Sequence, residues 1–331
     1  MQISRTELEQ LLTQVAQRFV SAEEAAYFAA EQVETHIRKS NRTNVLKEAL
    51  DDIETWQKHA DKKMEIVHEK PGMFKLNFNS LWPSLKLKRI HDTLQQKAQA
   101  NGIAICSLDN TWGMHTIHLW TQGLAKRWLV ALAAVNGGPD AVVPLHGTRG
   151  ILGTNPFSYA LPDGGHGKVI DMATSEIPYF EIVGAKKNNT PLRANAAVDQ
   201  NGNVTTDASQ ALDADGVSNL LPMGGNYKGY AFNYLMEIMT ASMIGAKLSN
   251  QQDPSYVYED HGGFIIAIDI ASFTSLDTFT KNTSELDQVI KSQPAQAGHE
   301  IIIPWENNLK RLAETGEILE VEEELVERLR G

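Results

Sequence analysis

The chain has 331 residues, of which 42% are hydrophobic and 21% charged, and its formal net charge is −11. This composition is typical of a globular protein with a core large enough for two lobes, and the acidic balance argues against general binding to nucleic acid or to anionic membranes. A single cysteine, Cys106, excludes an internal disulfide, and without an apolar leader or a long apolar run we expect a cytoplasmic protein with no membrane contact.

The first 60 residues read as three helices. Ser4 and Glu7 have the spacing of a capping box, and Ser21 with Glu24 repeats that signal before a second helix. A third helix is expected over residues 44–58. The apolar residues that recur at helical spacing along these segments are Leu8, Leu11, Leu12, Val15, Phe19, Ala25, Ala29, Val33, Ile37, Val45, Leu46, Leu50 and Ile53.

Strands and helices are mixed in the middle of the chain. Strands are expected at 64–67, 74–78, 103–108, 129–135, 159–161, 168–172, 262–270 and 300–303. Helices are expected at 87–100, 119–128, 178–187, 230–244, 286–291, 305–316 and 321–330. The pattern predicts an α+β fold with a helical lobe from residues 1–62 and 285–331. Residues 63–284 form a central lobe, and ligands would bind between the two.

Three short runs attract attention in the central part, and two of them contain glycines. They are the GTNP run (153–156), the DMATS run (171–175), which has no glycine, and the PMGGNYKGY run (222–230). Together we call them the glycine-bearing runs, after the first and the third. Glycines let the backbone approach a ligand, and N–H groups at the start of a helix favour anions. Each run alone fits a turn or a helix cap equally well. A Rossmann G-x-G-x-x-G fingerprint between a strand and a helix is absent.

The order and spacing of the three runs resemble the malate/L-lactate dehydrogenase family that lacks a Rossmann fold, and the resemblance covers nearly the whole chain. It implies a homodimer that binds NAD or NADP in a non-Rossmann sheet-and-helix lobe. The cofactor contacts it implies are Asp171, Met172, Ala173, Thr174, Ser175, Tyr227, Lys228, Trp305 and Glu306. Two departures stand out: Asn226 is inserted before Tyr227, and Trp305 replaces the glycine of the family's Pro-Gly-Glu.

The catalytic positions depart further from the family. Its Ser-His-Gly falls on residues 42–44, with Thr43 in place of the histidine. Lys47 replaces the following arginine and Gly113 the second histidine. Ketone reduction needs a proton donor, and histidine suits neutral pH because its ordinary pKa is about 6.5. Threonine does not ionise, so Thr43 is expected to orient a substrate. A small shift of the loop would bring His115 to the vacant place. The candidate catalytic residues are therefore His115, Lys47 and Thr43.

Other residues remain candidates at this point. His36 lies seven residues before Thr43, and His146 stands where the family often has tryptophan. Asn155 in the GTNP run and Arg149 are expected to bind a substrate carboxylate, for which arginine offers two parallel donors. The H-x-x-H spacing of His115 with residue 118 lacks a further ligand cluster, so no metal is expected.

Two functions fit these patterns. One is an NAD(P)-dependent oxidoreductase acting on a small 2-oxo or 2-hydroxy acid or on a cyclic imine carboxylate, with non-standard acid–base residues. A protonated imine already carries its proton, which would relax the need for a histidine. The alternative is a non-catalytic, regulatory relative that binds the dinucleotide without turnover. A third reading has the missing groups supplied by a partner subunit.

Overall fold

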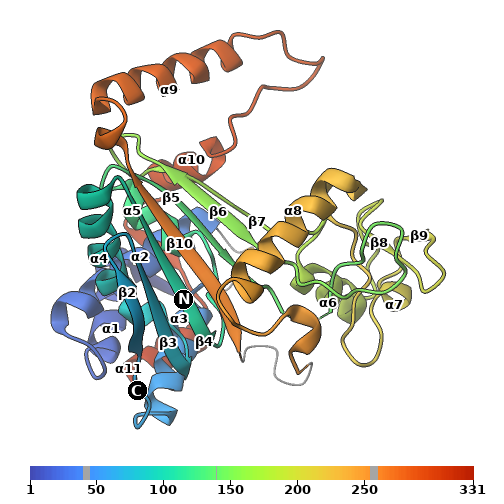
Figure 1. Cartoon of the computed structure of the whole chain (residues 1–331), viewed down its shortest axis with the longest axis horizontal. Coiled ribbons are helices and arrows are strands. Elements are labelled where there is room, and N and C mark those ends of the chain that lie inside the picture. The colour runs from blue at the N-terminus through green and yellow to red at the C-terminus, as the bar shows by residue number, and fades with distance from the viewer. Residues whose placement is uncertain (40–44, 139, 254–259) are drawn as a thin grey trace.

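A computed structural model describes residues 1–39, 45–138, 140–253 and 260–331 (Figure 1). The strands are β1 (Gln2–Ser4), β2 (Glu65–Lys70), β3 (Met73–Leu81), β4 (Ile103–Thr111), β5 (Leu129–Val135), β6 (Phe157–Leu161), β7 (Lys168–Met172), β8 (Ala197–Val198), β9 (Val204–Thr205), β10 (His261–Asp269) and β11 (Ile318–Glu320). The helices are α1 (Arg5–Ala16), α2 (Ala22–Lys39), α3 (Val45–Lys58), α4 (Leu87–Asn101), α5 (Leu119–Ala125), α6 (Tyr179–Asn188), α7 (Ala208–Ala211), α8 (Tyr227–Glu237), α9 (Leu276–Lys291), α10 (Glu306–Glu314) and α11 (Glu323–Arg330).

A seven-stranded sheet in the order β2-β3-β4-β10-β5-β6-β7 forms the centre of the molecule. β3 and β4 are parallel and joined by α4, whereas the other neighbouring pairs are antiparallel. β10 comes from late in the chain and lies between β4 and β5, with Ile265 opposite both Cys106 and Ala133. The predicted α+β fold without a Rossmann arrangement is confirmed.

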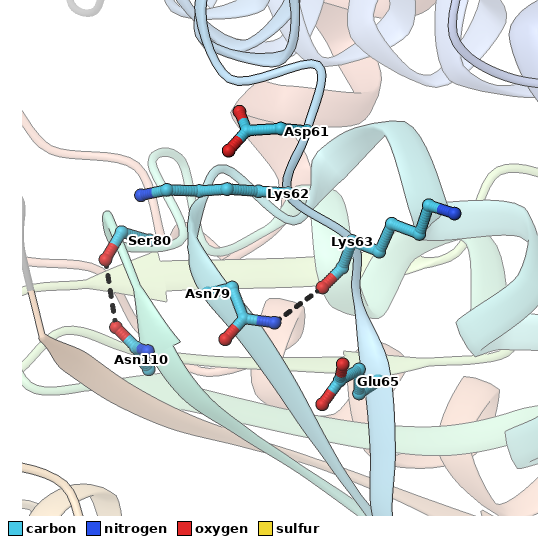
Figure 2. Close-up of a pocket in the computed structure, with 7 residues that line it drawn as sticks. All are labelled: Asp61, Lys62, Lys63, Glu65, Asn79, Ser80 and Asn110. Atoms are coloured by element: carbon cyan, nitrogen blue, oxygen red, sulfur yellow. Dashed lines mark hydrogen bonds between the residues drawn. The ribbon is translucent and has the colours of Figure 1, made fainter.

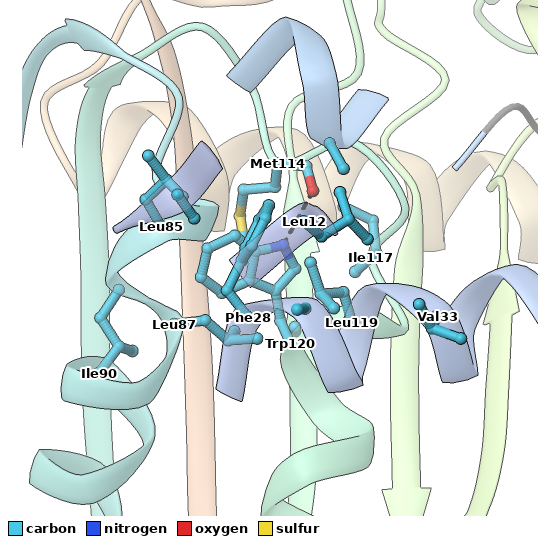
Figure 3. Close-up of a cluster of buried hydrophobic side chains, with 14 of the residues drawn as sticks. Leu12, Phe28, Val33, Leu85, Leu87, Ile90, Met114, Ile117, Leu119 and Trp120 are labelled. Carbon is cyan, nitrogen blue, oxygen red and sulfur yellow. Dashed lines mark hydrogen bonds between the residues drawn. The ribbon is translucent and has the colours of Figure 1, made fainter. Parts of the chain in front are cut away.

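One face of the sheet carries the larger core. α4 and α5 pack on this face, and α2 packs on both of these helices. Their apolar residues join those of α1, α3 and α11 in a single cluster that includes Phe28, Leu87 and Trp120 (Figure 3). Since this cluster unites terminal helices with the sheet, the terminal and central parts of the chain share one core. The boundaries 1–62 with 285–331 and 63–284 stay a prediction.

The opposite face is covered by α8 and the π turn Ile238–Ser242 that continues it. Alternate residues of β10 serve the two faces: Phe264 packs with Met236 here, whereas Ile265 belongs to the larger core. A further cluster built from residues 141–220 holds α6, α7 and the β8–β9 hairpin in a smaller lobe beside the sheet (Figure 1). α8 therefore lies between the smaller lobe and the sheet.

Three details differ from the sequence-based expectations. The strand predicted at 300–303 is wrong, because these residues form no ladder. The helix predicted at 286–291 begins at Leu276, where the Ser275 hydroxyl accepts a hydrogen bond from the Thr278 N–H. The chain ends also pair, since β1 and β11 form a two-stranded antiparallel sheet. This pairing brings the N-terminal and C-terminal helices together, as Figure 1 shows.

α9 projects from the rest of the molecule (Figure 1), and none of its residues is buried. Leu286 and Val289 are exposed on it, and Phe273 is exposed just before it. Within the described ranges, no helix combines the length and the apolar character that crossing a membrane requires.

Candidate functional site

The three glycine-bearing runs meet at a buried knot of hydrogen bonds. The side-chain amide of Asn233, on α8, donates to the Gly153 carbonyl and to the Thr174 hydroxyl, each at 2.9 Å. Thr174 in turn donates to the Asn155 carbonyl at 3.0 Å, and the Asn155 amide donates to Glu237 at 2.8 Å. All five residues except Gly153 carry polar side chains that are fully or nearly fully buried. Such satisfied networks are rigid, so the GTNP and DMATS runs are held in fixed positions against α8.

Backbone contacts complete the convergence at the start of α8. The Met223 N–H donates to the Thr174 carbonyl at 2.9 Å. Asn226, the inserted residue, is the N-cap of α8, and its side chain accepts hydrogen bonds from the Lys228 and Gly229 N–H groups. The helix predicted to begin at Tyr230 therefore begins three residues earlier. A Cβ on Gly229 would lie 1.8 Å from the Met223 carbonyl oxygen, so only glycine allows this close approach.

Asp171, at the end of β7, forms a second junction. Its carboxylate lies 2.7 Å from Lys39 Nζ, at the end of α2, and accepts a hydrogen bond of 3.2 Å from the His118 N–H. The His118 side chain is buried, and the Gln122 side chain is the group that hydrogen-bonds to it. Burial, with the charges of Lys39 and Arg38, lowers the pKa of His118 well below its ordinary value. His118 is therefore neutral at physiological pH.

The remaining predicted cofactor contacts lie at two places. Tyr227 and Lys228 are exposed at the first turn of α8, directly beside the converged runs. Trp305 and Glu306 begin α10, which packs along the edge strand β7. Lys168 of β7 lies over the Trp305 ring at 4.7 Å. A cavity of about 450 Å³ opens beside Trp305 and Glu306 on α10.

Residues 112–118, between β4 and α5, form a segment that we call the histidine loop. Met114 and Ile117 anchor it in the larger core, and the Trp120 indole N–H donates to the Met114 carbonyl at 2.8 Å (Figure 3). Between these anchors, His115 has a φ of 48°, which is rare for a residue with a side chain. The anchors therefore fix the loop and turn His115 away from the core.

The His115 ring lies between two side chains from other elements. Its Nε2 atom is 2.8 Å from Oδ1 of Asp52 on α3, within hydrogen-bonding distance of that carboxylate. One face of the ring stacks on Trp82, with ring centres 3.5 Å apart and planes 15° from parallel. The Asp52 side chain is fully buried, whereas that of His115 is 13% exposed. The histidine is thus the member of the pair that a ligand can reach.

Charge and burial act in opposite directions on this pair. Burial raises the pKa of Asp52 to about 6, although the nearby His115 opposes the rise. Burial alone would lower the pKa of His115, but the Asp52 carboxylate, with Glu48 and Asp51 on the same helix, outweighs it and raises that pKa above its ordinary value. The contact therefore favours a negative charge on Asp52 and a proton on His115.

The structure explains why glycine stands at position 113. Gly113 has a φ of 117°, and a Cβ there would lie 3.1 Å from the Trp82 ring. The Trp82 indole occupies the space beside this position, and the imidazole that packs on it belongs to His115 instead. A histidine two residues later in the loop thus stands close to the place where the resemblance expected one.

The other predicted site residues are placed as follows. Thr43 lies outside the described residues. Lys47 is exposed on α3, 3.4 Å from Asp51. The Asn155 side chain is fully buried within the knot, and Arg149 is 61% exposed, 3.6 Å from Asp213 in the smaller lobe. The substrate-binding roles of Asn155 and Arg149 stay predictions.

A cavity of about 580 Å³ lies elsewhere, beyond the end of α3 (Figure 2). Its lining residues come from the α3–β2 connection, β2, β3 and β4 and are Asp61, Lys62, Lys63, Glu65, Asn79, Ser80 and Asn110. Asn79 donates to the Lys63 carbonyl and Ser80 to the Asn110 side chain, so its polar wall is largely bonded to itself. None of the three glycine-bearing runs contributes to this cavity.

Sequence patterns had not singled out four residues of the site: Lys39, Asp52, Trp82 and Asn233. Two of them carried a readable signal, because Asp52 and Asn233 are polar residues on the buried faces of their helices. Lys39 and Trp82 carried none. Within the ranges that the structure describes, no group of three or more His, Cys, Asp or Glu residues is arranged to hold a metal.

Comparison with known proteins gives consistent matches. Residues 3–330 match the family described as malate/L-lactate dehydrogenase. Malate/(S)-sulfolactate dehydrogenase from Methanothermus fervidus is 28% identical over 81% of this chain and 77% of that protein. A Δ1-pyrroline-2-carboxylate/Δ1-piperideine-2-carboxylate reductase from Pseudomonas syringae is 35% identical over 48% of this chain and 46% of its own length. The solved structure of sulfolactate dehydrogenase from Methanocaldococcus jannaschii shares the fold, with a TM-score of 0.83, 23% identity, and coverage of 99% and 95% of the two chains.

Proposed function

Because this chain belongs to the malate/L-lactate dehydrogenase family, we propose that it is an NAD(P)-dependent oxidoreductase that interconverts a small 2-oxo acid and its 2-hydroxy acid, or reduces a cyclic imine carboxylate. Relatives are named for 2-hydroxy acids and for cyclic imine carboxylates, and others for dependence on NAD⁺ or NADP⁺. All of these reactions transfer a hydride to or from a carbon that bears a carboxylate. The substrate class of the proposal is their common chemistry.

The convergence of the three glycine-bearing runs is the observation that carries the cofactor assignment. The runs are far apart in the sequence yet are joined at Asn233 and at the start of α8. Gly225 has a φ of 59° and open space where a Cβ would lie, so its backbone is accessible to a ligand. Exposed Tyr227 and Lys228 stand beside it. A bare backbone, a ring and a cation fit the phosphate and aromatic parts of a dinucleotide.

The dinucleotide supplies the hydride when bound, and the protein has to supply the proton. We assign this proton to His115, which is partly exposed and whose pKa is raised because the Asp52 carboxylate outweighs burial. His118 is unsuited because it is buried and neutral. His36 is also unsuited to donate a proton, because burial lowers its pKa. Lys47 and Thr43 are kept as candidates for orienting the substrate.

Two sites for the substrate carboxylate fit this proposal. Arg149 is exposed and has a free planar fork beyond its contact with Asp213, which suits a carboxylate. Lys39 is the other cation close to the DMATS run, where it neutralises Asp171. If Arg149→Ala loses substrate affinity while its dinucleotide affinity is unchanged, Arg149 rather than Lys39 binds the substrate carboxylate.

The alternative function is a dinucleotide-binding relative without turnover. It is favoured by one observation, the replacement of the expected catalytic histidine by Thr43. The two functions share the cofactor site and differ only in whether His115 works as an acid. Titration of NADH and NADPH by protein fluorescence tests the shared part. Assays of NAD(P)H oxidation with 2-oxo acids and cyclic imine carboxylates then separate the two functions.

The expected result is binding of at least one dinucleotide with a turnover that consumes it. Binding without turnover across both substrate classes would favour the regulatory alternative. No association of either dinucleotide at millimolar concentration would contradict both functions, because each depends on the converged runs.

We further propose that two copies of the chain form a homodimer through α9. This helix has 16 residues, none of them buried, and it exposes Leu286 and Val289 together on one face. An amphipathic helix that projects alone is stabilised when its apolar stripe is covered. Sedimentation should give about twice the 36.6 kDa of one chain. The double variant Leu286→Glu, Val289→Glu should be a monomer, whereas the control Lys281→Glu on the same helix should remain a dimer. A monomeric parent chain would contradict the proposal.

A further inference from the structure

Buried polar atoms with few hydrogen-bond partners gather around the histidine loop. Among the described residues, Trp112 Nε1 has no partner, Asp52 Oδ1 lies against His115 Nε2 at 2.8 Å, and the buried His118 ring interacts with the Gln122 side chain. Folded proteins pair nearly all such atoms, because each unpaired one costs about 1–3 kcal/mol. Their concentration at one place, beside a charged His–Asp pair, is typical of a site that acts on a ligand rather than of a structural core.

Asp52 is held at this place by the helix that carries it. Glu48 and Asp52 are one turn apart on α3 and both face the histidine loop, since Glu48 accepts a hydrogen bond of 3.0 Å from the Thr116 hydroxyl. Two carboxylates of one helix thus contact adjacent residues of the loop. Glu48 fixes the loop backbone, and Asp52 reaches the imidazole of His115.

A structural ion pair would not need this arrangement. A fully buried carboxylate whose close partner is a single imidazole is costly, and an apolar residue of similar volume would fill the same space at less cost. Asp52 is not needed to hold the loop, because Met114 and Ile117 already anchor it in the core. The remaining effect of Asp52 is on the charge and orientation of His115.

We propose that Asp52 is a positioning residue that holds His115 against Trp82 in its protonated form, so that His115 can deliver a proton to the substrate. This rests on the proposed function of the site. Trp82 limits the movement of the His115 ring, because the indole covers one face of the imidazole. Asp52 keeps its own charge throughout and touches neither substrate nor cofactor.

The chemical step balances as follows. In reduction of a 2-oxo acid, the hydride and its electron pair pass from the bound NAD(P)H to the carbonyl carbon, and the C=O π bond breaks toward oxygen. The proton of His115 passes to that oxygen, which becomes the hydroxyl of the 2-hydroxy acid. The products are the hydroxy acid, NAD(P)⁺ and neutral His115, which takes a proton from water before the next cycle. Oxidation runs the same steps in reverse and needs neutral His115.

Asp52→Asn keeps the shape of the side chain and removes its charge. Reduction should slow by about tenfold or more in kcat, while KM for the dinucleotide should stay within about twofold. Without the carboxylate, burial lowers the pKa of His115. The alkaline limb of the reduction profile should therefore move to lower pH by about one unit or more. Oxidation needs neutral His115, so it should be retained at lower pH than in the parent enzyme.

Asp51→Asn is the matched control. Asp51 is the next residue on α3, and its carboxylate contacts Lys47 and Arg328 rather than His115. Together with Glu48 it is the other charged group that acts on His115, at longer range than Asp52. The control should move the pH profile much less than Asp52→Asn does, because Asp51 acts on His115 without contacting it. Equal losses in both directions of the reaction with an unshifted profile in Asp52→Asn would show a merely structural role and overturn the proposal.

A measurement on the unaltered protein does not depend on the variant folding. The His115 imidazole can be titrated by ¹⁵N NMR, with its signal assigned by its loss in His115→Gln. A pKa above about 6.5 supports the proposal, and a value below it overturns the proposal. The same titration distinguishes this proposal from the proposed function. A raised pKa of His115 without turnover would contradict proton delivery by His115 but would not contradict dinucleotide binding. Failure to bind a dinucleotide would contradict the proposed function itself.

Discussion

The converged glycine-bearing runs and the histidine loop lie close together but are built in opposite ways. At the runs, nearly every buried polar group is paired: Asn233, Thr174 and Asn155 exchange donors and acceptors with each other and with the backbone. At the histidine loop the buried polar groups have fewer partners: His115 meets the Asp52 carboxylate, His118 interacts with Gln122, and the Trp112 indole N–H has no partner among the described residues. The hydrogen bonds of the first region hold its backbone rigid. The polar groups of the second region are available to a ligand.

This difference in hydrogen bonding matches the different demands of cofactor binding and of proton transfer. A dinucleotide site can be made from backbone shape, which fully satisfied hydrogen bonds keep rigid. Proton transfer needs a side chain whose charge responds to its surroundings, and this requires burial next to a specific partner. His115 and His118 show how local this control is. They are three residues apart, yet the Asp52 carboxylate raises the pKa of the first, and burial beside Lys39 lowers that of the second.

The largest effect should come from removing the acid at the histidine loop. His115→Ala should lower kcat for reduction by about 100-fold or more, which is the usual contribution of a general acid. Dinucleotide affinity should not change, because no converged run contacts His115. Steady-state assays and NADH titration measure the two quantities. His118→Ala would be the competing test: if it abolished turnover while His115→Ala did not, the assignment of the two histidines would be reversed.

The sequence marked the residues of the proposed cofactor-binding region for a physical reason. Close backbone approaches demand glycine, as at Gly229 beside the Met223 carbonyl, and helix starts demand a capping residue such as Asn226. These demands leave short, local signatures. The strands of the seven-stranded sheet and most helices were also predicted, because period-2 and helical apolar patterns are local too. The fold class followed from them.

The catalytic region left no such signature. His115 depends on Asp52 and Trp82, which lie 63 and 33 positions earlier in the chain, as their numbers show, and only the folded structure brings them together. Asp52 stands among apolar neighbours on α3, which marks it as unusual but does not name its partner. The resemblance pointed to Gly113, and the Trp82 ring explains why no side chain can replace it there. Tertiary contacts of this kind cannot be read from spacing alone.

A smaller effect is expected from breaking the scaffold. Asn233→Leu keeps the volume and removes the donors to Gly153 and Thr174, leaving buried acceptors unpaired. The free energy of unfolding should fall by about 2–4 kcal/mol, measured by urea titration. Dinucleotide affinity should fall with it, because the runs lose their common anchor. Tyr234→Phe, at the exposed neighbour on α8, is the control that should change neither. A stable Asn233→Leu protein with full affinity would show that the runs do not depend on the knot.

The smallest effect tests whether the scaffold is a binding site at all. Lys228 is exposed at the first turn of α8 and takes no part in the knot, so Lys228→Ala should leave stability unchanged. Loss of a single cation beside a phosphate should weaken dinucleotide affinity by about tenfold, or about 1.4 kcal/mol. The loss should shrink as salt is added, because an exposed charge is screened. Lys281→Ala, on the projecting helix α9, is the control because it changes the net charge of the protein by the same amount. An effect seen only in Lys228→Ala therefore comes from a local contact. If Lys228→Ala and the parent chain bind the dinucleotide equally well at low salt, the phosphates do not lie at the start of α8. The convergence of the runs at that place would be unaffected by this result.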